Sequence, residues 1–130
     1  MIEFKWCIDL FEYKKLCKNV SYYAKEYPEI IEVVGDFEIN VNGETFFSQP
    51  YFPIIEFIRA LDKWKETENI VYNCLETDDN PLISFISTNK AWTIKSSWQL
   101  FECKVIFSKG ELLESFNKLK NSVKKQFEEL

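Results

Sequence analysis

The run from Phe37 to Phe47 constrains the fold of this chain most. Apolar and polar residues alternate along the run, and the Asn42-Gly43 pair interrupts it near its middle. Alternation with a period of two is typical of a strand that buries one face, and Asn-Gly readily adopts the positive φ angles of a type I′ turn. The run therefore predicts a β-hairpin.

The expected register of this hairpin places Val41 opposite Glu44, and Ile39 then lies opposite Phe46. The apolar side of the hairpin would consist of Phe37, Ile39, Val41 and Phe46. The other side, which we expect to face water, would consist of Glu38, Asn40, Thr45 and Phe47.

Hydrophobic spacing predicts the other elements. A half-buried strand is expected over Ile2 to Ile8, and helices are expected before Pro28, after Pro53 and after the S-x-x-E capping box Ser108 to Glu111. The first of these helices carries Tyr13, Leu16, Cys17, Val20, Tyr23, Ala24 and Tyr27 at helical spacing. Short alternating runs predict an antiparallel meander over Ile70 to Thr77, Leu82 to Ser87, Trp92 to Ser97 and Phe101 to Phe107.

Length and aromatic content favour one compact domain over residues 1–130. The chain has 130 residues, with twelve Phe, six Tyr and four Trp against three Gly and four Pro. Disordered chains lack aromatic residues in such numbers, and this length is enough for one hydrophobic core. We expect an α+β fold, mainly an antiparallel sheet formed by the hairpin and the meander, packed with two or three helices that include a long C-terminal one.

Charge is distributed unevenly along the chain. The net charge is −5, but residues 26–89 carry thirteen carboxylates and only three basic residues, Arg59, Lys63 and Lys65. An acidic surface of this kind favours a basic partner, whereas binding to nucleic acid requires a basic face. We therefore expect a protein partner and no nucleic acid.

The candidate residues for partner binding are acidic side chains of the middle stretch and one tryptophan at a strand end. The simpler interpretation of the acidic side chains is a solvated face that keeps the protein soluble. Trp98 fits a core position and a surface anchor equally well. The set is Glu38, Glu44, Glu66, Glu68, Glu76, Asp78, Asp79 and Trp98.

Catalytic and metal-binding motifs are missing from the sequence. The chain has no histidine, and three glycines cannot form a G-x-G-x-x-G loop. Residues 78–81 form a D-D-N-P run that is ordinary turn chemistry and lacks the pattern of a calcium loop. We expect no catalytic residue, no metal and no cofactor. A small enzyme that relies on carboxylates and lysines is the less favoured alternative. Such an enzyme would require a deep pocket that holds ionisable groups with strongly shifted pKa values.

The four cysteines, Cys7, Cys17, Cys74 and Cys103, match no zinc-binding spacing, so we expect free, reduced and mainly buried thiols. No apolar run reaches the length of a signal peptide or a membrane span. These features predict a cytoplasmic protein that does not insert into membranes.

Four segments of the chain together resemble small bacterial immunity proteins. They are residues 35–47, the run from Pro50 to Phe57, the Leu61 to Trp64 segment and the Trp92 to Gln99 segment. These are the antidotes encoded beside polymorphic and contact-dependent toxins, and the likeness extends over most of residues 33–130. The resemblance implies a cytoplasmic, non-enzymatic protein that binds a toxin effector domain and blocks its action. Shared fold alone does not fix function, and a structural or self-associating domain with an apolar patch at Phe47, Tyr51 and Trp98 is the alternative.

Overall fold

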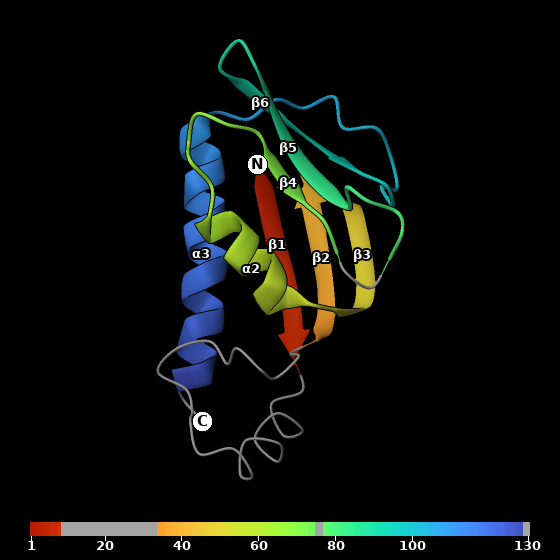
Figure 1. Cartoon of the computed structure of the whole chain (residues 1–130), viewed down its shortest axis with the longest axis vertical. Helices are drawn as coiled ribbons and strands as arrows, with labels where there is room; N and C mark the ends of the chain where they lie inside the picture. Colours follow the sequence, from red (N-terminus) through yellow and green to blue (C-terminus); the bar gives the residue numbers. More distant parts are fainter. Residues whose placement is uncertain (9–33, 75–76, 129–130) are drawn as a thin grey trace.

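Figure 1 shows the computed structural model, which describes residues 1–8, 34–74 and 77–128. Within these residues, the strands form two three-stranded antiparallel sheets with the orders β1-β2-β3 and β4-β5-β6. The fold is therefore α+β, as the sequence predicts. The predicted helix over residues 13–27 lies outside the described residues. In chain order the elements are β1 (Ile2–Ile8), β2 (Gly35–Val41), β3 (Glu44–Phe52), α2 (Ile54–Asp62), β4 (Ile70–Tyr72), β5 (Ile83–Thr88), β6 (Ala91–Ser96) and α3 (Lys109–Glu128).

The predicted hairpin is formed by β2 and β3, but its register differs from the expectation. Val41 lies opposite Glu44, whereas Ile39 lies opposite Phe47 because the register shifts between Ile39 and Asn40. An extra residue on one strand is a β-bulge, and it turns successive side chains away from strict alternation. The placement of Phe47 on a solvated side is therefore wrong, and Asn40, expected on the same side, is buried as well.

The bulge allows two consecutive phenylalanines of β3 to be buried. Phe46 and Phe47 are both fully buried. Phe46 makes an edge contact with Phe101, with ring centroids 5.5 Å apart, and its carbonyl oxygen accepts a hydrogen bond of 2.8 Å from the Leu100 amide. Phe47 stacks on Trp98 with a centroid distance of 6.4 Å. The chain after β6 thus covers a face of the hairpin that an isolated hairpin would expose.

Both described helices begin where the sequence predicts. α2 follows Pro53 directly and buries Ile54, Ile55, Phe57, Ile58 and Leu61. The capping box of α3 forms as expected: the Glu111 amide donates to Ser108 Oγ at 3.1 Å, and the Ser108 amide donates to Glu111 Oε1 at 3.4 Å. The buried stripe of α3 contains Leu112, Phe116, Leu119 and Val123.

The meander is shorter than predicted at two places. The first of its strands ends at Tyr72 instead of Thr77, because the amide and carbonyl of Cys74 bond to the Asn80 side chain and not to a neighbouring strand. No strand forms over Phe101 to Phe107, where one isolated bridge joins Phe107 to Trp92. Burial alternates along this segment as it would in a strand, because every second side chain still packs against the core.

Aromatic contacts join the two sheets and the helices into one hydrophobic cluster. Tyr72 of β4 packs on Phe52 of β3 and on Phe57 of α2, with ring centroids 5.9 and 5.3 Å apart. Phe85 of β5 contacts Phe116 of α3 at 5.1 Å. α3 runs beside β1, and α2 lies next to α3 (Figure 1). The aromatic-rich composition is therefore used for contacts between elements that are distant in sequence.

Candidate functional site

The most highly structured group of predicted binding residues lies in the turn between β4 and β5, residues 77–81. Its centre is the Asn80 side chain, whose Nδ2 donates to the carbonyl oxygens of Cys74 and Thr77 at 2.9 and 2.7 Å. Asn80 Oδ1 accepts from the Cys74 amide at 2.9 Å, and the Asp79 amide donates to Thr77 Oγ1 at 3.1 Å. Asn and Asp side chains stabilise turns by such local bonds. The backbone that carries Asp78 and Asp79 is therefore held in place.

Trp98 connects this turn to the rest of the molecule. Its indole Nε1 donates to Asp79 Oδ2 at 2.8 Å, and its ring lies nearly parallel to that of Phe47, at 12°. Ser97 Oγ donates to the Pro81 carbonyl oxygen at 2.9 Å. Trp98 is half-buried, so it packs against the core and also reaches the surface. We call Asp78, Asp79 and Trp98 the acidic turn patch.

The remaining predicted carboxylates lie on other elements. Glu38 is half-buried in the middle of β2, opposite Lys5 of β1 and Ser48 of β3, and Glu44 is exposed at the start of β3. Glu66 and Glu68 are exposed in the segment between α2 and β4, and Glu76 falls outside the described residues. Glu66 lies 3.7 Å from Lys109, at the start of α3. Of the described set, the structure brings only Asp78, Asp79 and Trp98 together.

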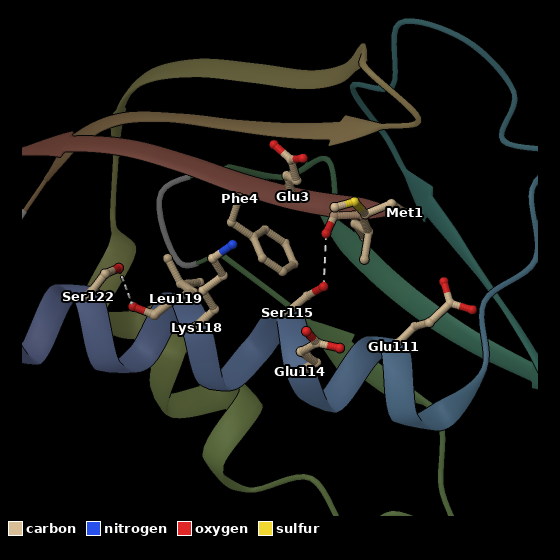
Figure 2. Close-up of a pocket in the computed structure, with 10 residues that line it drawn as sticks. Met1, Glu3, Phe4, Glu111, Glu114, Ser115, Lys118, Leu119 and Ser122 are labelled. Carbon is tan, nitrogen blue, oxygen red and sulfur yellow. Dashed lines mark hydrogen bonds between the residues drawn. The ribbon is translucent and has the colours of Figure 1, made fainter.

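A groove runs between β1 and α3 (Figure 2). Its volume is about 430 Å³, and the residues along it include Ile2, Phe4, Glu114, Lys118 and Leu119. None of the predicted binding residues lines it. Sequence reasoning missed this groove because it depends on how α3 lies against β1; the only local signal was the capping box, which locates the start of α3.

A second groove, of about 410 Å³, lies between α2 and β4. The three basic residues of the acidic middle stretch, Arg59, Lys63 and Lys65, all line it, together with Glu56 and Glu68.

Tyr72 also lines this second groove, and its hydroxyl donates to Glu56 Oε1 at 3.3 Å. Burial, helped by the nearby Glu56 carboxylate, raises the pKa of Tyr72 well above its usual value. The phenol therefore keeps its proton to a higher pH than an ordinary tyrosine does, and it acts as a hydrogen-bond donor.

The described cysteines are free but differ in exposure. Cys74 is buried and Cys103 is half-buried, in line with a structural role. Cys7 is exposed on the outward side of β1, so the expectation of a buried thiol is wrong for this residue. Strand alternation explains the difference, because Trp6 and Ile8 turn inward on either side of it. Cys17 lies outside the described residues.

Within residues 1–8, 34–74 and 77–128, no group of three or more Cys, Asp or Glu side chains is placed to hold a metal ion. No described helix has the length and apolar character needed to cross a membrane.

Residues 9–129 match a family described as a domain of unknown function (DUF7878), and the chain belongs to that family. Neither a curated protein nor a solved structure matches the chain.

Proposed function

We propose that this protein is a non-enzymatic immunity protein that binds a basic bacterial toxin domain through the acidic turn patch. The observation that carries the proposal is the fixed geometry of Asp79, which is bonded through its amide to Thr77 and through its carboxylate to Trp98. Binding residues that are ordered before association lose less conformational entropy when the partner docks. The patch also combines carboxylates with a half-buried tryptophan, a residue type enriched at interface hot spots.

The charge distribution supports a basic partner. Asp78 and Asp79 are exposed, and the whole chain has a net charge of −5. Toxin domains that attack nucleic acid need a basic surface to hold phosphate, and an acidic inhibitor would be attracted to that surface. The finer part of the proposal, that the partner is a bacterial toxin met in the cytoplasm, rests on the resemblance to immunity proteins.

The proposal is tested with the product of the neighbouring gene, purified as an inactive variant and titrated with this protein at low and moderate salt. We expect one-to-one binding that weakens with salt. The double variant Asp78→Lys/Asp79→Lys should slow association by about tenfold or more at low salt, because charges at the contact steer the encounter.

The matched control is Asp36→Lys/Glu102→Lys, which makes the same change in net charge at two exposed positions outside the patch. It should slow association much less than the double variant in the patch. Equal effects of the two variants would mean that only overall charge matters, and would remove the acidic turn patch from the interface. Absence of binding to the neighbouring gene product, together with failure to neutralise its toxicity, would overturn the immunity function.

A further inference from the structure

Among the described strands, β1 lies at the edge of its sheet, and α3 runs beside it (Figure 1). The Asn42 amide donates to the Met1 carbonyl oxygen at 2.8 Å, so the pair formed by residues 1 and 42 is hydrogen-bonded across the ladder. Bonded and non-bonded pairs alternate in an antiparallel ladder, and the β1–β2 register contains no shift. The main-chain groups of Ile2, Phe4 and Trp6 therefore point away from β2. Ile2 confirms this orientation, because its carbonyl oxygen accepts a 2.8 Å bond from Ser115 Oγ of α3.

α3 bonds to β1 at two points, once to the main chain and once to a side chain. Ser115 binds the Ile2 carbonyl, and further along the helix Ser122 Oγ accepts a 3.0 Å bond from Trp6 Nε1. The groove of about 430 Å³ is lined by both serines and extends past Ser115 to Met1 and Glu111, with the Phe4 ring directed from β1 toward α3 (Figure 2). Outside the β1–β2 ladder, no group in the described part of the chain bonds to the Phe4 N–H or C=O. Free edge groups of this kind can pair with an added strand.

The charges around the groove favour a basic occupant. Glu111 and Glu114 of α3 line it together with the cation Lys118, whereas the Glu3 carboxylate is directed away from α3 (Figure 2). The amino group of Met1 bonds to Asn42 Oδ1, on the β2 side of the strand, so it is turned away from the open edge. Glu111 is partly used in the helix cap. Glu114, one turn before Lys118 on α3, is the carboxylate best placed to receive a cation.

We propose that this groove binds an extended, basic segment of a partner protein by strand addition to β1. The segment pairs its main chain with the N–H and C=O of Phe4 in the groove and with those of Trp6, which lies beyond the groove on the same edge of β1. A lysine or arginine of the segment lies against Glu114. In strand addition the main-chain bonds supply affinity, and the side-chain contacts supply specificity. The proposal does not rest on the immunity function, because none of its residues belongs to the acidic turn patch.

The test is a selection of random-sequence peptides displayed on phage against the full-length chain, followed by binding measurements on the enriched peptides. We expect basic peptides with alternating β-branched residues, which slow hydrogen exchange at the Phe4 and Trp6 amides. Glu114→Lys should weaken these peptides by about tenfold, and Lys118→Glu should strengthen them by a similar factor, since each reverses one charge at the groove.

The control on the same helix is Lys124→Glu, an exposed position that does not line the groove, and it should leave the affinity within about twofold. Asp78→Lys/Asp79→Lys should also leave it unchanged, which separates this site from the acidic turn patch. The proposal is overturned if no peptide is enriched, if the bound peptides leave exchange at Phe4 and Trp6 unchanged, or if the two groove variants shift affinity in the same direction.

Discussion

Gly35 shows how closely β1 and β2 approach at one end of their ladder. It lies opposite Ile8, and a Cβ atom at this position would come within 2.3 Å of the Cys7 carbonyl oxygen. That atom belongs to the backbone and cannot rotate aside. Gly35→Ala should therefore lower the free energy of unfolding by about 1–3 kcal/mol, measured by urea denaturation.

Gly110→Ala is the control for this substitution. Gly110 lies in the first turn of α3, where a Cβ would meet nothing closer than Ser108 Oγ at 3.9 Å. Alanine is the better helix former, so this change should leave stability unchanged or raise it by up to about 1 kcal/mol. If both variants unfold at the same urea concentration, the result would contradict the close approach of the β1 backbone to Gly35.

At the scale of elements, the start of α3 depends on the reciprocal bonds between Ser108 and Glu111. Ser108→Ala removes the acceptor for the Glu111 amide and should cost about 0.5–2 kcal/mol of unfolding free energy. Ser108→Asp keeps an acceptor at the same place and should retain most of the stability. Urea denaturation monitored by helical circular dichroism compares the two, and equal losses would contradict a capping role for Ser108.

The elements also show where sequence patterns report burial and where they report pairing. The run over residues 101–107 alternates in burial but makes a single bridge, so alternation located its buried side chains and not its hydrogen bonds. In β3 the sequence pattern predicts the pairing only next to the turn. The Asn-Gly turn sets the first pair, Val41 with Glu44, and the tertiary contacts of Phe46 and Phe47 determine the register beyond it.

At the scale of the whole molecule, Tyr72 links the two sheets and makes the stability of the fold depend on pH. Its ring contacts Phe52 and Phe57, and burial raises the pKa of its phenol above the usual 10.0. The folded state therefore holds its proton to higher pH than the unfolded chain does. The stability that this difference provides is fully present below about pH 10 and is lost as the pH rises above that value.

Tyr72→Phe should remove this loss of stability. The free energy of unfolding of the variant should therefore fall less steeply above pH 10 than that of the wild type. The phenol of Tyr72 contributes at most about 1.4 kcal/mol per pH unit to the wild-type slope. Below pH 10 the variant should be less stable by about 0.5–1.5 kcal/mol, because the bond to Glu56 is lost. Tyr51→Phe is the control, since Tyr51 is 78% exposed. Identical pH profiles for Tyr72→Phe and the wild type would contradict the burial of an ionisable phenol.

The candidate binding surface shows the limit of sequence reasoning at the same scale. The sequence predicts a binding set of seven carboxylates from the acidic stretch and Trp98. The structure gathers Asp78, Asp79 and Trp98, and it places Glu38, Glu44, Glu66 and Glu68 on other elements. The link between Asp79 and Trp98 spans 19 positions in the chain. Local composition cannot indicate such a contact.

The sequence by itself determined the α+β class, β1, the hairpin turn and the starts of α2 and α3. These features depend on periodicity, turn chemistry and capping, which act over a few neighbouring residues. Only the tertiary structure decided the division into two sheets, the bulge at Phe46, the acidic turn patch and the groove between β1 and α3. Each of these depends on contacts between segments that are distant in the chain, and those contacts form only when the aromatic core packs.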